Sequence, residues 1–185
     1  MEEFLSVIAR FDKATEQNLI GLAADAGVEG LDPHLTFGVY SEMLAQDLIE
    51  WVKRIAGGQP KLPIGLCGIG VYFGDWLSVV PRADIRLLGL HQRLHGRYEE
   101  YCTNFTAPGD WTPHISLCGC TPERLREFAA LFRETKGELI SLQVSGRRGD
   151  AFQLLGSFDL IGSHSAEKIP PKKKSLTALK KSGRV

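Results

Sequence analysis

The chain has 185 residues, of which 43% are hydrophobic and 24% are charged, and its 22 basic and 22 acidic side chains give no net charge. This composition is typical of a globular domain and excludes a globally disordered chain. No apolar run is long enough to span a bilayer, and the first residues lack the basic and apolar segments of a secretory signal. We therefore expect a cytoplasmic protein that binds no membrane, and we expect it to be a monomer.

The neutral total hides an uneven distribution of charge. Residues 164–185 contain seven of the basic side chains and one acid, Glu167, so the rest of the chain is acidic. The sequence therefore predicts a folded domain over residues 1–163 and a basic, flexible tail over residues 164–185. Such a tail is either a solvated chain end or an attachment point for polyanions, and the sequence leaves both interpretations open.

The first half of the chain predicts six elements in the order strand, helix, strand, helix, strand, strand. Their bounds are a strand at 4–11, a helix from 13 to about 27, a strand at 34–37, a helix from 42 to about 57, and strands at 62–73 and 76–80. Asp12 and Ser41 are suitable N-caps for the helices, and Gly74-Asp75 between the last two strands is a tight-turn signal. The apolar helix residues expected to face the core are Leu19, Ile20, Leu22, Ala23, Ala24, Leu44, Leu48, Trp51, Val52 and Ile55.

The second half repeats this order after Pro81. It predicts a helix at about 83–102, a strand at 111–117, a helix from 122 that ends at Gly137, and strands at about 138–145 and 151–160. Thr121 followed by Pro122 is a strong helix start, because Pro fits the first helical position. Strands joined by tight turns pair antiparallel. We therefore expect an α+β fold with two pseudo-symmetric lobes, each a small, mainly antiparallel sheet backed by helices, and a cleft between the lobes.

Two strands, one in each half, begin with the same short motif. Residues 33–37 read Pro-His-Leu-Thr-Phe, and residues 113–117 read Pro-His-Ile-Ser-Leu. Alternate side chains of a strand share a face, so the imidazole and the hydroxyl of each motif lie side by side, roughly 7 Å apart. A single His-x-Thr is a weak signal, but two copies at equivalent places in a repeated unit predict one site that both lobes share.

Two imidazoles that face each other across a cleft suit displacement at phosphorus. The attacking oxygen must lose a proton and the leaving oxygen must gain one, on opposite sides of the phosphorus atom. Histidine has an ordinary pKa of about 6.5, so at neutral pH one ring can be neutral while another is protonated. His34 and His114 are therefore the candidate acid and base, and the hydroxyls of Thr36 and Ser116 can donate hydrogen bonds to the non-bridging oxygens. This chemistry requires no metal and no cofactor.

The two motifs resemble the paired His-x-Thr/Ser motifs of the 2H phosphoesterase superfamily, in its branch of 2′-5′ RNA ligase-like and cyclic phosphodiesterase proteins. The resemblance covers about residues 4–160 and includes the run Trp-Leu-Ser-Val-Val-Pro at 76–81. It implies a bilobal fold and metal-free cleavage of RNA 2′,3′-cyclic phosphates, 2′-5′ linkages or other cyclic or oligonucleotide phosphodiesters. It also implies RNA ends, oligonucleotides or cyclic nucleotides as partners, with 2′-5′ RNA ligation in the reverse direction as an alternative activity.

Aromatic residues near the predicted cleft strands are candidates for stacking on substrate bases. Trp76 and Tyr72 are the preferred candidates, followed by Tyr40. Ordinary core packing is the alternative role for each of them, and also for Trp111.

Two other classes of function stay open. A nucleotide- or RNA-binding module without turnover would keep the same cleft. A metal-dependent hydrolase would use His91 and His95, spaced i, i+4 on a helix, together with Cys118. No acidic residue completes a metal motif there, so a metal is not expected. The four cysteines form neither a disulfide framework nor a CxxC pair, and we expect them to be reduced.

Overall fold

The computed structural model of the chain describes residues 4–148 and 151–161. The predicted basic tail at 164–185 and its boundary at 163 lie outside the described residues. The elements are β1 Phe4–Phe11, α1 Lys13–Asp25, β2 Leu35–Tyr40, α2 Ala45–Gly57, β3 Leu62–Tyr72, β4 Trp76–Pro81, α3 Ile85–His95, η1 Glu99–Tyr101, η2 Asn104–Thr106, β5 Ile115–Gly119, α4 Pro122–Leu131, β6 Thr135–Arg148 and β7 Ala151–Asp159. Within these ranges, none of the helices combines the length and the apolar character that crossing a membrane requires.

The strands of the described residues form one antiparallel sheet. Their order is β2-β1-β6-β3-β4-β5, and β7 pairs with β6 off this path. β6 joins the two halves, because it pairs with β1 along Phe4–Phe11 and with β3 through Thr135–Leu139. The predicted α+β class and the antiparallel pairing are confirmed, and the sheets of the two lobes are fused into one.

The strand order reveals which elements of the two halves are equivalent. It is palindromic, so β1-α1-β2-α2-β3 corresponds to β4-α3-β5-α4-β6, and β7 has no counterpart within the described residues. The hydrogen bond from Asp12 N to Glu138 O after β1 matches the one from Arg82 N to Gly65 O after β4. Each repeat therefore begins one strand before the Pro-His motif, and the two motif strands are the edges of the sheet.

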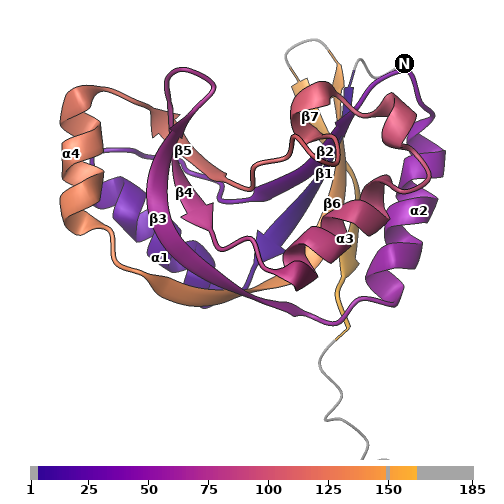
Figure 1. The fold of residues 1–185 in the computed structure, drawn as a ribbon, viewed down its shortest axis with the longest axis horizontal. Helices are drawn as coiled ribbons and strands as arrows, with labels where there is room; N and C mark the ends of the chain where they lie inside the picture. Colours follow the sequence, from indigo (N-terminus) through magenta and orange to yellow (C-terminus); the bar gives the residue numbers. More distant parts are fainter. Residues whose placement is uncertain (1–3, 149–150, 162–185) are drawn as a thin grey trace, which may run out of the picture.

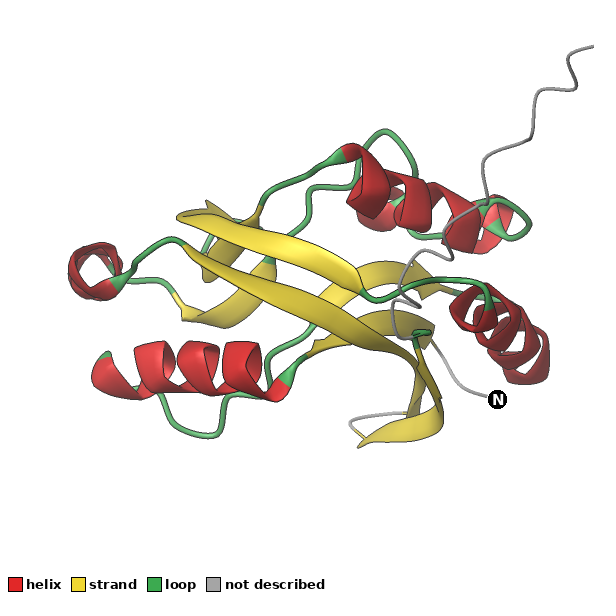
Figure 2. Cartoon of the chain, turned by 90° about the horizontal axis from the view of Figure 1, so that it is seen from below, coloured by secondary structure: helices red, strands yellow, loops and turns green. Residues whose placement is uncertain are grey.

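The sheet is strongly curved, with helices along its outer sides (Figures 1 and 2). Figure 1 shows α1 and α4 at one end of the molecule and α2 and α3 at the other. α1 packs against α4 and β6, whereas α2 packs against β6, β7 and α3. The curvature brings the edge strands β2 and β5 into contact with each other.

α1 begins as predicted, whereas α2 begins later than expected. Asp12 caps α1 by accepting hydrogen bonds from two backbone N–H groups of the first turn. Ser41 does not cap α2, because Glu42 adopts a φ of +59°, outside the helical region, and the helix starts at Ala45. Of the helix residues of the first half that were expected to face the core, Ile20, Ala24 and Leu44 are exposed in the structure. One residue step turns a helix by about 100°, which carries Ile20 and Ala24 away from the buried row of α1.

The helices of the second half are shorter than predicted. α3 ends at His95, where Gly96 follows, and the expected continuation to residue 102 contains the 3₁₀ turn η1. Gly137, which was expected to end α4, lies inside β6. A Cβ at Gly137 would overlap the hydroxyl of Thr15, which donates to the Asp12 carboxylate. The close approach of α1 to β6 therefore requires glycine at this position.

We expect Gly137→Ala to destabilise the fold, because the new methyl group overlaps the Thr15 side chain. The expected loss in the free energy of unfolding, measured by urea denaturation, is about 1–3 kcal/mol. Gly68→Ala in β3 is the matched control, because a Cβ there meets no atom within 4 Å. Equal losses in the two variants would contradict the proposed contact.

Candidate active site

The two motifs occupy equivalent edge strands. His34 immediately precedes β2 and His114 immediately precedes β5. The order of buried, half-buried and exposed residues is the same over 31–38 and 111–118: the histidine and the hydroxyl residue are half-buried, and the apolar residue between them is buried. The imidazole and the hydroxyl of each motif therefore share a face, as the strand alternation predicts.

Each histidine ring is held by the same hydrogen bond. The Nδ1 atom of His34 lies 2.8 Å from the carbonyl oxygen of Asp32, and the Nδ1 atom of His114 lies 2.8 Å from that of Thr112. A carbonyl oxygen only accepts, so Nδ1 carries the hydrogen in both rings. The bond orients each ring and leaves Nε2 as the atom that can exchange a proton with a substrate.

The outer supports of the two rings differ. Asp32, which holds the first ring, forms an ion pair with Arg10 at 2.6 Å. His114 instead stacks on Tyr72, with ring centroids 4.9 Å apart and 18° between the planes. Tyr72 can fold back in this way because Gly70 has no side chain: a Cβ at Gly70 would lie 2.9 Å from the tyrosine ring. The first histidine is therefore supported by charge and the second by an aromatic face.

A β-bulge follows the hydroxyl residue in each motif. In the first motif, Thr36 lies opposite Ile8 of β1, and the register then shifts at Phe37. In the second motif, Ser116 lies opposite Ser78 of β4, and the register shifts at the equivalent place. Bulges bend a strand and re-aim its side chains, and they are frequent next to active sites. Both strands are thus bent at the hydroxyl that the sequence analysis singled out.

One open depression is lined by residues from both motifs. It includes His34 from the first, Ser116 from the second, and Phe73 and Trp76 from the hairpin between β3 and β4. His114 and Thr36 do not line it, but the ring of His114 packs against that of Phe73 at 66°, with centroids 5.3 Å apart. The fold therefore places residues from opposite edges of the sheet around a common space.

Phe73 is an aromatic residue of this depression that the sequence analysis missed. It is 58% exposed and adopts a φ of +52°, which is rare for a large side chain. Its ring also packs against Phe105, with centroids 5.5 Å apart. Strained backbone of this kind clusters at functional positions. The signal in the sequence was the Gly74-Asp75 turn, which placed residue 73 at a hairpin tip without indicating where its side chain would lie.

The three aromatic residues predicted to stack on a substrate have different surroundings. Trp76 is 46% exposed and lines the depression. Tyr72 covers His114, and burial raises the pKa of its hydroxyl. Tyr40 is fully buried at the end of β2, and its hydroxyl donates to Nδ1 of His95 at 3.2 Å. Tyr40 therefore offers no open face to a nucleobase, because its side chain points into the core.

A buried network holds the first motif against the segment that leads to the second. Nε1 of Trp111 donates to the carbonyl oxygen of Thr36 at 3.0 Å, and Nε2 of His95 donates to that of Phe37 at 2.9 Å. His91 stacks on Trp111, with centroids 4.0 Å apart and 5° between the planes. Because Trp111 lies two residues before the second motif, the network couples the positions of the two motifs.

His91 and His95 belong to this network rather than to a metal pair. Both are buried, and Nε2 of His91 donates to the carbonyl oxygen of Thr106 at 2.9 Å. Burial, reinforced by the neighbouring His95, lowers the pKa of His91 to about 4, and burial also lowers the pKa of His95. The four cysteines, including Cys118, are free thiols. Across residues 4–148 and 151–161, no group of three or more His, Cys, Asp or Glu side chains could hold a metal ion.

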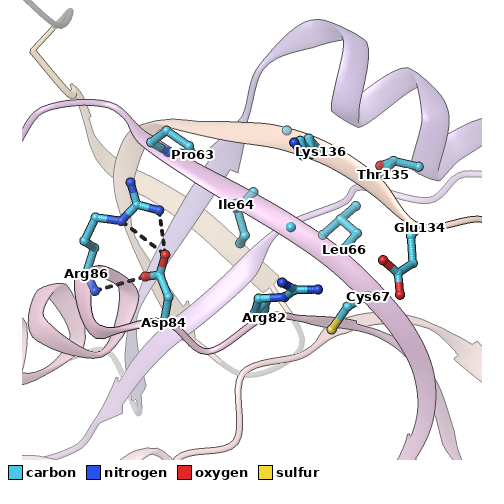
Figure 3. A pocket seen from close by; sticks show the side chains of 12 residues that line it. Pro63, Ile64, Leu66, Cys67, Arg82, Asp84, Arg86, Glu134, Thr135 and Lys136 are labelled. Atoms are coloured by element: carbon cyan, nitrogen blue, oxygen red, sulfur yellow. Dashed lines mark hydrogen bonds and ion pairs between the residues drawn. The ribbon is translucent and has the colours of Figure 1, made fainter.

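A second depression lies along β3 and contains no residue of either motif (Figure 3). Its charged lining residues are Arg82, Asp84, Arg86, Glu134 and Lys136. Arg86 and Asp84 form an ion pair at 2.6 Å, drawn as dashed lines in Figure 3. Because positive and negative side chains alternate around it, this depression has no marked preference for an anion. The candidate site is therefore the depression between the motifs.

Comparison with known proteins supports the fold. No protein-family model and no curated protein matches the sequence. A solved structure described as a phosphoesterase is similar over 86% of this chain and 99% of its own, with a TM-score of 0.61 and 17% identity. Apo LigT from E. coli is similar over 86% of this chain and 98% of its own, with a TM-score of 0.60 and 17% identity. The LigT complex with 3′-AMP is similar over 86% of this chain and 99% of its own, with a TM-score of 0.58 and 16% identity.

Identities this low establish the fold alone. The sequence resemblance to 2H phosphoesterases implied this fold, and the comparison confirms the fold because the match spans nearly the whole length of the solved chains. The roles of the individual side chains rest on the geometry of this chain.

We expect the buried His91 to make stability depend on pH. With a folded pKa of about 4 and an ordinary value of 6.5, the unfolded chain binds a proton between these values that the folded chain does not. Stability is therefore complete above pH 6.5 and falls as the pH drops toward 4. Urea unfolding at pH 5.0 should show about 2 kcal/mol less stability than at pH 7.5 from this group.

His91→Phe keeps a ring on Trp111 but removes the titrating group. This variant should show a shallower loss of stability between pH 7.5 and 5.0 than the wild type. The same slope in both proteins would contradict a neutral, buried His91.

Proposed function

We propose that this chain is a 2H phosphoesterase, a metal-independent phosphodiesterase in which His34 and His114 act as general acid and base. The observation that carries the proposal is the identical Nδ1 hydrogen bond of both rings on equivalent edge strands. It gives both rings the same tautomer, with Nε2 free for proton transfer. The fold shared with phosphoesterase structures supports the same conclusion.

The proposed reaction is an in-line displacement at phosphorus. In hydrolysis of a 2′,3′-cyclic phosphate, a water oxygen bonds to phosphorus while one bond from phosphorus to a ribose oxygen breaks on the opposite side. One histidine takes the proton from water at Nε2, and the other, protonated, gives its proton to the leaving ribose oxygen. Thr36 and Ser116 donate hydrogen bonds to the non-bridging oxygens as negative charge builds there.

The roles of the two histidines reverse with the direction of the reaction. After one turnover the base is protonated and the acid is neutral, and proton exchange with solvent restores the first state. Cleavage of a 2′-5′ linkage into a 2′,3′-cyclic phosphate and a 5′-hydroxyl uses the same pair, and ligation is the reverse of that cleavage with the roles exchanged. In ligation the 5′-hydroxyl oxygen loses its proton and bonds to phosphorus, while the bond from phosphorus to O3′ breaks and O3′ gains a proton, so no further group is required.

The proposed substrates are RNA 2′,3′-cyclic phosphates, 2′-5′ linkages or other cyclic or oligonucleotide phosphodiesters. Phe73 and Trp76 present half-exposed rings beside His34, and such rings are suited to stacking on a nucleobase. LigT, which shares the fold, has been solved with 3′-AMP, a nucleoside phosphate. Residues 1–163 carry more acids than bases, which favours a short substrate over a long nucleic acid.

We expect the protein to hydrolyse a 2′,3′-cyclic nucleotide in the presence of EDTA. His34→Ala and His114→Ala should each lower kcat by roughly 10²- to 10⁴-fold, because each removes one proton-transfer group. A panel of 2′,3′-cyclic nucleotides, 2′-5′ dinucleotides and cyclic dinucleotides would identify the substrate class. Gln92→Ala, on the exposed side of α3, is the control and should keep wild-type turnover.

Three outcomes would contradict the proposal. Activity that disappears with the chelator would indicate a metal-dependent hydrolase. Binding of nucleotides without turnover would indicate a binding module. Turnover that is unchanged in both histidine variants would place the chemistry elsewhere.

We expect Phe73→Ala to weaken the binding of substrates that carry a base. Loss of one stacking ring, worth about 1–3 kcal/mol, should raise KM for a 2′,3′-cyclic nucleotide by roughly tenfold while changing kcat less. KM for ribose 2′,3′-cyclic phosphate, which has no base, should stay near the wild-type value. Phe152→Ala removes another exposed phenylalanine, on β7, and serves as the matched control. An equal rise in KM for both substrates would contradict base stacking.

A further inference from the structure

Ser78 carries a buried hydroxyl without a partner, next to the second motif. Its side chain is 0% exposed, and among the described residues its Oγ atom has no hydrogen-bond partner. Buried polar groups are normally hydrogen-bonded, because losing water without a replacement is unfavourable. An unpaired hydroxyl in the middle of a strand therefore requires an explanation.

The place of Ser78 in the sheet points to Ser116. The two residues lie directly opposite each other in the ladder between β4 and β5. Directly opposite residues share a face of the sheet, with Cβ atoms about 4.5–5.5 Å apart. On its other side, Ser78 pairs with Gly70 of β3. The ring of Tyr72 lies close to Gly70 and stacks on His114. The unpaired hydroxyl thus lies between the phosphate-binding serine and the support of the second histidine.

The first motif lacks such a hydroxyl. The residue opposite Thr36 is Ile8, which has no polar group to offer. Threonine is branched at Cβ, and its side chain is stiff in χ1, whereas serine is not branched and rotates more freely. The motif with the less constrained hydroxyl is therefore the one with a second hydroxyl opposite it.

We propose that Ser78 is a positioning residue for Ser116, a role that rests on the proposed function. When a phosphodiester occupies the site, a χ1 rotation brings the two hydroxyls together, and Ser78 donates its hydrogen to Ser116 Oγ. Ser116 then keeps its own hydrogen directed at a non-bridging oxygen, since a hydroxyl accepts and donates at the same time. Linked hydrogen bonds polarise one another, so the effect grows as charge builds on the phosphoryl oxygen. Ser78 therefore acts on kcat more than on KM.

The competing explanation is purely steric. On that explanation, residue 78 must be small because a larger side chain beside Gly70 would collide with the ring of Tyr72. On that explanation alanine, which is smaller still, replaces Ser78 without any effect on turnover. The two explanations therefore differ in what Ser78→Ala does to kcat.

The test measures kcat, KM and Tm with a 2′,3′-cyclic nucleotide. Ser78→Ala should lower kcat about tenfold, leave KM within about twofold, and leave Tm unchanged or higher, because an unpaired buried hydroxyl is removed. In a Ser116→Ala background, Ser78→Ala should have no further effect, since the group it positions is gone. Ser116→Thr should restore kcat in the Ser78→Ala protein, because the branched side chain sets its own rotamer.

Ile8→Val, opposite Thr36, is the matched control and should keep wild-type kcat. If the wild type turns over the substrate and Ser78→Ala has the same kcat, this inference is contradicted while the proposed function stands. A fall in kcat that is just as large in the Ser116→Ala background would also contradict it, because the effect would not pass through Ser116. A wild-type protein without any turnover would overturn the proposed function and this inference together.

Discussion

The double pairing of β6 is the constraint on which the candidate site depends. This strand pairs with β1 along most of its length and with β3 through its first five residues, Thr135–Leu139. The two halves are therefore one curved sheet rather than two bodies joined by a linker. The proposed transfer of protons to and from oxygens around one phosphorus atom requires the two imidazoles to be held within fractions of an ångström. A continuous hydrogen-bonded sheet meets that requirement better than two lobes that can move independently.

The strand order places both histidines at the start of edge strands, and an edge strand leaves backbone groups without partners. In β2 these groups are bound from the other half of the chain, by Trp111 and His95. Both donors are neutral at physiological pH, because the indole of Trp111 does not titrate and burial lowers the pKa of His95. An unpaired charge in that position would be strongly unfavourable. The same contacts protect the edge from pairing with another chain and hold the first motif against the second. Stability and the geometry of the site thus share one network.

The two halves match in some respects and differ in others. The Nδ1 hydrogen bonds, the pattern of burial and the bulge after the hydroxyl are the same in both motifs. The supports differ: Arg10 holds Asp32 on one side, and Tyr72 lies on His114 on the other. The proposed reaction is itself asymmetric, because at any moment one ring gives a proton and the other takes one. Two histidines in equivalent positions but with different surroundings are therefore compatible with a preferred direction of the proposed reaction.

The sequence by itself determined the order of the main helices and strands and the placement of the two Pro-His motifs at equivalent strands. These depend on local signals: Asp12 as an N-cap, Gly74-Asp75 as a turn, and Pro-His followed by alternation, all of which act within a few residues. Only the tertiary structure decided that Tyr40 faces the core, that Gly137 lies in a strand against Thr15, and that Phe73 lines the depression beside His34. The partners in each of these contacts are far apart along the chain. Their meeting is set by the curvature of the sheet and the packing of helices on it, which no local pattern of residues encodes.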